Sequence, residues 1–191
     1  MSRSSSEATE PSLRQLSQAL GVPELRCGRH ALRDQKGWLD DKIEAGYLWH
    51  ALVMPSFHPW AAIGLVHMDQ SEFRGKEHPS IMRAAMVLFD REGGQVRGWS
   101  ATEVNSDPLA ETIRGLQVLP GTKSVFLDGI SYRVCTSDWE IEATIHMHNP
   151  RSTSLRAIEQ SLFQVASTVQ SQTGNDEIAV YLNSWQEYLK Q

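Results

Sequence analysis

Cysteine is scarce in this sequence, because the 191 residues include only Cys27 and Cys135. Two cysteines so far apart match neither the paired spacing of a zinc site nor that of a redox motif. They are also too few for the disulfide framework of a small secreted domain. We therefore expect reduced thiols and a cytoplasmic protein.

Long hydrophobic runs and an excess of positive charge are also absent. The longest clearly apolar stretches, such as residues 84–89, are far shorter than the roughly 20 residues that a transmembrane helix needs. The N-terminal segment MSRSSSEATEPS has no apolar core of a secretory signal. Lysine and arginine total 18 against 23 acidic residues, which gives a formal net charge of -5. We expect neither a membrane nor a nucleic-acid partner, since nucleic-acid binding normally brings a basic surface.

The short motifs of common enzyme classes are missing as well. There is no G-x-S-x-G nucleophile elbow, no phosphate-binding glycine-rich loop and no H-E-x-x-H metal motif. The segment REGGQVRG has three glycines but lacks the lysine and the helix of a nucleotide loop. The sequence therefore assigns no catalytic residue and no cofactor.

Positive charge is concentrated in one short segment, from Arg26 to Arg33, which surrounds Cys27. Neighbouring cations favour the reactive thiolate form of a cysteine. The motif CGRH places no base beside the thiol, so a partly exposed cysteine in a basic segment is the simpler interpretation. The alternative is that this basic segment binds an acidic partner or a phosphate.

What the chain does contain is a globular composition with clear periodicity. Hydrophobic residues make up 40% and charged residues 21%, as expected for a soluble protein. We predict a disordered tail over residues 1–10 and a single α+β domain over residues 11–191. Apolar residues at helical spacing predict helices over 11–20, 108–117, 155–172 and 177–189, and one or two helical turns within 37–46. Alternation and turn residues predict strands over 47–54, 61–68, 80–90, 95–104, 123–127, 130–136 and 139–148.

This order of elements predicts the fold class. Segregated strands and helices indicate an α+β protein with an antiparallel sheet of about six to seven strands, covered by helices of which two are C-terminal. A C-terminal three-strand meander is part of the prediction. Asp128-Gly129 is a strong two-residue hairpin turn, and Ser137-Asp138 is a weaker one. Counting outward from the second turn places Val134 opposite Ile141 and Arg133 opposite Glu142.

The last predicted strand carries two histidines on its polar face. In WEIEATIHMHNP, the residues Trp139, Ile141, Ala143, Ile145 and Met147 form an apolar face, and His146 and His148 lie on the other. Two histidines on one strand face can ligate zinc or iron when a third ligand comes from elsewhere. The sequence shows no third ligand, although His50 or His67 would serve if either were adjacent. A solvated polar sheet face is the simpler interpretation.

The loop PSFHPW places Phe57, His58 and Trp60 between and beside two prolines. A rigid loop that carries aromatic side chains can form a recognition surface for another protein. Prolines and aromatics also simply close wide hairpins, which is the alternative.

Two functions are therefore open. The first is a small non-enzymatic protein-interaction module of the adaptor, chaperone-like or inhibitor/immunity type, with another protein as partner. The second is a small metal-binding protein or hydrolase that uses the His146 and His148 strand face.

Overall fold

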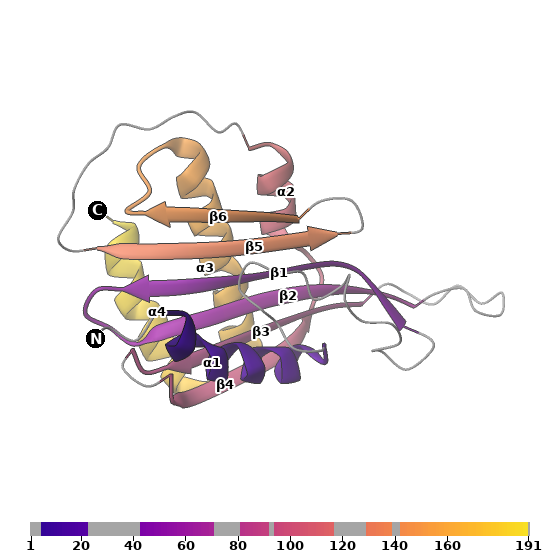
Figure 1. The fold of residues 1–191 in the computed structure, drawn as a ribbon, viewed down its shortest axis with the longest axis horizontal. Helices are drawn as coiled ribbons and strands as arrows, with labels where there is room; N and C mark the ends of the chain where they lie inside the picture. The colour runs from indigo at the N-terminus through magenta and orange to yellow at the C-terminus, as the bar shows by residue number, and fades with distance from the viewer. Residues whose placement is uncertain are drawn as a thin grey trace.

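The sheet of this protein is antiparallel and has six strands in the order β4-β3-β2-β1-β5-β6. The computed structural model describes residues 5–22, 43–70, 81–91, 94–116, 129–138 and 142–190. The strands are β1 (Ile43–Pro55), β2 (Trp60–Gln70), β3 (Ile81–Phe89), β4 (Val96–Val104), β5 (Ile130–Asp138) and β6 (Glu142–His148), all visible in Figure 1. The predicted α+β class with an antiparallel sheet covered by helices is confirmed.

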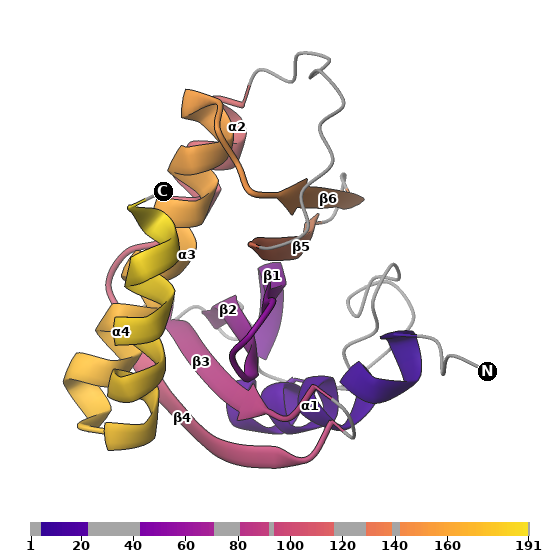
Figure 2. The ribbon, with the colours of Figure 1, turned by 90° about the vertical axis from the view of Figure 1, so that its left-hand side faces the viewer.

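The helices lie on both faces of the sheet. Figure 2 shows α2 (Pro108–Arg114), α3 (Thr153–Thr173) and α4 (Asp176–Leu189) along one face, and α1 (Ser5–Leu20) against the other. α1 contacts β2, β3 and β4, so it covers only the half of this sheet face that these three strands form. Among the described residues, no helix has the length and apolarity to cross a membrane.

β1 is a central strand that is buried on both sides, as expected for a segment whose residues 47–54 are apolar on both faces. Trp49 and Val53 face α3 and α4, whereas Leu48 and Leu52 face α1. The prediction of helical turns before it is wrong for residues 43–46, which belong to β1. These residues pair with the end of β2, where Ile43 lies opposite Gln70. The backbone hydrogen bonds of this pairing outweigh the weak helical pattern of the sequence. Residues 37–42 lie outside the described part.

The larger hydrophobic core lies between the sheet and the C-terminal helices. Apolar residues at helical spacing in α3 form a stripe that packs there, with Ile158, Leu162, Val165 and Val169 buried. The stripe of α4 packs beside it, and its Trp185 is fully buried. Ser152 and Asn175 cap the two helices with side-chain acceptors, and Gly174 ends α3 in the left-handed region.

A second core lies under α1 and contains Leu13, Leu16 and Leu20. This helix begins at Ser5, before the predicted start at Pro11, so residues 5–10 of the predicted tail are helical. The apolar spacing of the leucines predicts the packed half of the helix, whereas the first turns carry no such pattern.

The predicted register of the last hairpin is wrong. Val134 lies opposite Ile145, and Arg133 lies opposite His146, not Glu142. The physical reason is that β5 continues to Asp138, so the chain does not turn at Ser137-Asp138. Relative to the predicted pairing, β6 is displaced along β5 by an even number of residues. An even displacement keeps every side chain on its predicted face of the sheet. Ala143, Ile145 and Met147 accordingly remain on the core side.

The start of β5 is held by neighbouring segments. Gly129 has a positive φ of 144°, while Asp128 and the strand predicted over 123–127 lie outside the described residues. β5 lies between β1 and β6, so these three strands form one end of the sheet. The side-chain oxygen Asn149 Oδ1 accepts a hydrogen bond from the Ile130 backbone amide at 2.8 Å. The Asn149 backbone amide donates to the Ile130 carbonyl at 2.9 Å.

Candidate interaction surface

The loop between β1 and β2 is tied to two other parts of the fold. The Ser56 amide donates to the Gly129 carbonyl at 2.8 Å, and the Gly129 amide donates to Ser56 Oγ at 3.1 Å. On its other side, the Arg91 guanidinium donates to the Ser56 carbonyl. With Pro55 before it and Pro59 after it, the loop holds Phe57 and His58 in fixed positions.

Residues of this loop line two hollows. The inner pocket has a volume of about 370 Å³ and is lined by His58, Pro59, Leu88, Arg97, Glu177, Val180, Tyr181 and Ser184. The outer hollow has a volume of about 590 Å³ and is lined by Phe57, His58, Pro59, Asp90, Arg91, Gln95 and Arg97. The two share His58, Pro59 and Arg97, so they form one continuous surface, which we call the loop–α4 surface.

α4 contributes one face of its helix to this surface. Glu177, Val180, Tyr181 and Ser184 recur at the spacing of three and four residues that places side chains on one side of a helix. Tyr181 also belongs to the buried stripe, whereas the Val180 side chain is 67% exposed. Phe57, on the loop, is 71% exposed. Two large apolar side chains therefore stand in solvent at the rims of the surface.

The charges of this surface are only partly compensated. Arg97 Nε donates to Asp90 Oδ1 at 2.5 Å, which compensates that arginine. Arg91 donates to a neutral carbonyl, and Glu177 has no ion-pair partner among the residues that the structure describes. Glu177 instead lies against the backbone of Gly98 in β4. The outer hollow thus carries a surplus positive charge and the inner pocket a surplus negative one.

Tyr181 lines the inner pocket, but its hydroxyl oxygen is buried away from solvent and unsatisfied. Its side chain is only 4% exposed, and its hydroxyl has no hydrogen-bond partner in the described part of the chain. Burial raises the pKa of Tyr181 well above its ordinary value, and the neighbouring Tyr188 adds to this effect. The hydroxyl therefore stays protonated and is able both to donate and to accept.

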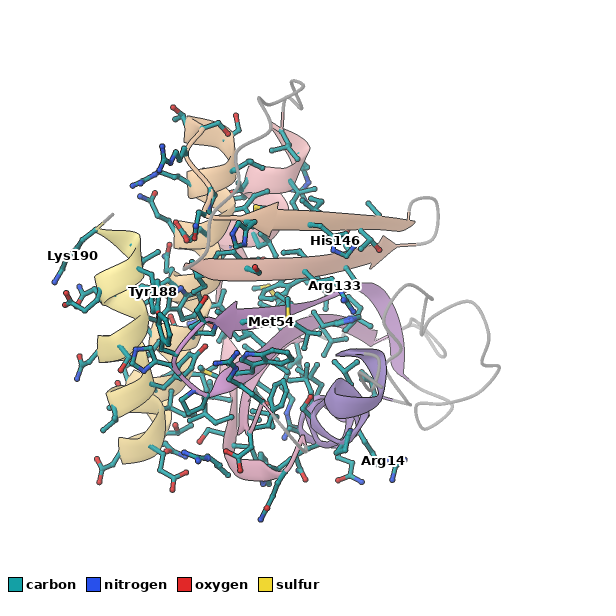
Figure 3. All side chains as sticks on the ribbon, turned by 60° about the vertical axis from the view of Figure 1, so that its left-hand side comes forward. Arg14, Met54, Arg133, His146, Tyr188 and Lys190 are labelled. Atoms are coloured by element: carbon teal, nitrogen blue, oxygen red, sulfur yellow. The ribbon has the colours of Figure 1, made fainter. Side chains whose placement is uncertain are left out.

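His58 and Trp60 lie on different sides of the sheet. The His58 ring packs edge-on against Tyr188 of α4, with ring centroids 5.8 Å apart, and Figure 3 shows Tyr188 on that helix. Trp60 instead packs against Phe89 in the core under α1, with ring centroids 6.1 Å apart. The structure thus brings Phe57 and His58 together at one surface and separates Trp60 from them.

The alternative site on β6 has a different geometry. His146 and His148 lie on the face of the sheet that points away from α3 and α4, and Figure 3 shows His146 beside Arg133. His148 Nδ1 and Ser131 Oγ are 2.6 Å apart. Within the described ranges, no group of three His, Cys, Asp or Glu side chains is placed to hold a metal ion. The structure brings neither His50 nor His67 to the pair.

A carboxylate–histidine pair that sequence reasoning missed lies at the start of α2. Asp107 Oδ2 is 3.0 Å from His67 Nε2 and accepts from Trp49 Nε1 at the same distance. Asp107 Oδ1 accepts from the amides of Leu109 and Ala110, both at 3.1 Å. Because these donors occupy both carboxylate oxygens, Asp107 is a helix cap that ties α2 to β1 and β2.

Sequence reasoning also missed the part that α4 plays in the loop–α4 surface. The helical period of residues 177–189 assigns Tyr181 to the buried stripe and gives Val180 no role. The available signal was that Val180 is a large apolar residue outside the stripe of an amphipathic helix, where polar residues are expected.

Comparison of the chain with protein-family models, with curated proteins and with solved structures finds no match.

Proposed function

We propose that the protein is a non-enzymatic protein-interaction module of the adaptor, chaperone-like or inhibitor type, and that it binds another protein through the loop–α4 surface. The observation that carries the proposal is a pair of exposed apolar side chains, Val180 at the inner pocket with its largely apolar lining and Phe57 at the adjoining outer hollow. Exposed large apolar groups beside a concavity are typical of protein-binding surfaces.

The rigidity of the loop supports the same proposal. Ser56 is bonded to Gly129 and to Arg91, so the loop is already ordered before a partner arrives. An ordered loop loses little conformational entropy on binding, which favours affinity. The aromatic residues Phe57 and His58 have few rotatable bonds and add to this advantage.

The chemistry of the surface favours binding over catalysis. Around the inner pocket the titratable groups include His58, Arg97 and Glu177, and none of these three is hydrogen-bonded to a nucleophile in the described residues. A general base for an activated nucleophile needs such a contact. We further propose that the protein acts in the cytoplasm, which agrees with the free thiol of Cys135.

The proposal is tested by affinity capture from the native cell extract with matched variants. The double substitution Phe57→Ser and Val180→Ser removes both exposed apolar groups and leaves the core intact. Trp99→Ser is the control, because Trp99 is a large apolar residue that is 47% exposed and lies outside both hollows. Mass spectrometry of the captured proteins compares wild type, double variant and control.

We expect one specific partner to be captured by the wild type and the Trp99→Ser control, and lost by at least tenfold with the double variant. The reason is that apolar anchors at the centre of an interface contribute about 2 kcal/mol or more each when they are hot spots. Capture of the same partner by the double variant and the wild type alike contradicts the proposal.

A further inference from the structure

The outer hollow contains an arginine whose charge has no acidic partner within the described part of the chain. The Arg91 guanidinium donates to the neutral Ser56 carbonyl and forms no ion pair with a described residue. We propose that the outer hollow binds the carboxylate of an aspartate or glutamate of the partner protein, and that Phe57 contacts an apolar residue beside that carboxylate. The proposal rests on the proposed function, and it adds the chemical class of the partner segment.

Arg91 is accessible to a partner. Its side chain is exposed and lines the outer hollow, which has a volume of about 590 Å³. The contact with Ser56 uses the Nη1 nitrogen, and the guanidinium has no other hydrogen bond among the described residues. A guanidinium presents its donors as a planar fork that matches the oxygens of a carboxylate, so its remaining donors suit such a group.

The loop holds this guanidinium in place before a partner binds. An arginine side chain has a large rotamer entropy, and an ion pair at the surface has to offset the loss of that entropy. Arg91 is already bonded to the Ser56 carbonyl, and the Ser56 amide is bonded in turn to the Gly129 carbonyl at 2.8 Å. Part of the entropy loss has therefore occurred in the free protein, which favours binding.

The other charges of the outer hollow favour a carboxylate over a phosphate. Arg97 and Asp90 also line it, and the contact between them at 2.5 Å compensates both charges. The charge of Arg91 then matches the single charge of a carboxylate. A phosphate group carries about two negative charges near neutral pH, and Asp90 repels the second of them.

Phe57 explains why the carboxylate should lie beside an apolar residue. Its side chain is 71% exposed and lines the same hollow, together with Pro59. Covering an exposed aromatic ring removes a large apolar area from water, which stabilises a complex. A run of acidic residues would leave the ring uncovered, and the net charge of -5 on the protein would repel it. A single acid between apolar residues fits both features.

The test uses three peptide probes on the full-length protein labelled with ¹⁵N. The acetylated and amidated tripeptides Leu-Glu-Leu, Leu-Gln-Leu and Leu-phosphoserine-Leu differ in the central side chain alone. Titrations followed by NMR chemical shifts measure each Kd and show which amides respond. We expect the shifts to centre on Phe57, Arg91 and Gln95. The glutamate probe should bind roughly two- to fivefold tighter than the glutamine probe, the range of a partly exposed ion pair. It should also bind tighter than the phosphoserine probe.

Three variants locate the origin of that preference. Arg91→Gln removes the charge and should bring the Kd values of the glutamate and glutamine probes together. Arg91→Lys keeps the charge and should retain part of the difference. Arg14→Gln is the matched control, because Arg14 is exposed on α1 (Figure 3), lines neither hollow and loses the same charge. It should keep the full preference. Thermal melts and the amide signals of residues 56–58 verify that each variant retains the fold and the loop.

The inference is overturned by equal Kd values for the glutamate and glutamine probes, by tighter binding of the phosphoserine probe, by a glutamate preference that survives Arg91→Gln, or by the absence of binding up to the solubility limit. These outcomes are separate from the failure of the proposed function. If partner capture depends on Phe57 and Val180 while the probes show no glutamate preference, only this inference fails. If the probes behave as expected while capture is unchanged in the Phe57/Val180 double variant, only the proposed function fails.

Discussion

At the residue scale, buried polar side chains connect the sheet to the C-terminal helices. Tyr132 of β5 donates to Glu159 Oε1 of α3 at 2.5 Å, and Trp185 of α4 donates its indole hydrogen to the Tyr132 hydroxyl at 2.9 Å. All three side chains are almost completely buried. Burial raises the pKa of Tyr132, and the nearby Glu159 carboxylate raises it further, so the phenol remains a donor.

Glu159 should make stability depend on pH. Burial raises the pKa of Glu159 above its ordinary value of 4.5, although the hydrogen bond from Tyr132 and the charge of Arg156 act in the opposite direction. A carboxyl whose pKa is higher in the folded protein contributes stability below the pKa of the unfolded chain. That contribution is lost as the pH rises through the folded-state pKa.

We therefore expect Glu159→Gln to flatten the pH dependence of the free energy of unfolding between about pH 4.5 and neutral pH. The wild type should lose stability across this range, and the variant should lose less. Urea unfolding at a series of pH values measures the effect. Glu103→Gln, which removes an exposed carboxylate from β4, is the control and should keep the wild-type slope. A variant slope equal to that of the wild type would show that Glu159 is not the group responsible.

Gly129 is a position where both backbone conformation and space require glycine. Its φ is 144°, and a side chain there would clash with the Asn149 amide group. We expect Gly129→Ala to cost about 1–3 kcal/mol from backbone strain, with a further loss from the broken Asn149 contact. Gly174→Ala is the matched control, because Gly174 also has a positive φ but its added methyl group would meet no atom within 4 Å. Chemical denaturation should show the larger loss at Gly129, and equal losses would contradict this account.

At the element scale, periodicity predicts most of the described helices and strands to within a few residues. The cap at Asp107 is a clear local signal, and α2 begins at Pro108 as expected. The register of β5 and β6 was not predictable, because an even displacement keeps the same residues on the same face. Only the actual end of β5 at Asp138 distinguishes the two registers, and no strong turn residue marks it.

The packing of α3 on the sheet gives the element-scale prediction. Leu162 is fully buried at the centre of the α3 stripe. Leu162→Ala should therefore cost about 2–5 kcal/mol, as truncations of buried leucines do. Gln164→Ala changes an exposed residue of the same helix and should cost less than about 0.5 kcal/mol. A loss below about 1 kcal/mol for Leu162→Ala in urea melts would mean that this stripe is not tightly packed.

At the scale of the whole molecule, the surfaces differ in what they present. The loop–α4 surface joins apolar rims to a pocket, whereas the face of β6 that carries His146 and His148 is polar. The sequence predicts a recognition surface at Phe57 and His58, because a loop between prolines is a local signal, and this assignment stays a prediction. Sequence reasoning could not identify Val180 and Tyr181 as their neighbours, because that part of the surface comes from α4, which is distant in sequence.

The polar face of β6 gives a further expectation. Replacing His146 and His148 together by glutamine should leave the melting temperature and partner capture nearly unchanged, because neither side chain is buried in the core. Metal analysis of untagged protein accompanies the melts. A large drop in melting temperature, or the loss of bound metal, would favour the alternative metal-binding function.

The most direct test of the central claim is a hydrogen–deuterium exchange footprint of the protein with and without its captured partner. Binding through the loop–α4 surface predicts slower exchange over residues 56–60 and 177–184, with little change over residues 142–148. Slower exchange confined to residues 142–148, with none in the loop or in α4, would contradict the claim and place the partner on the histidine face.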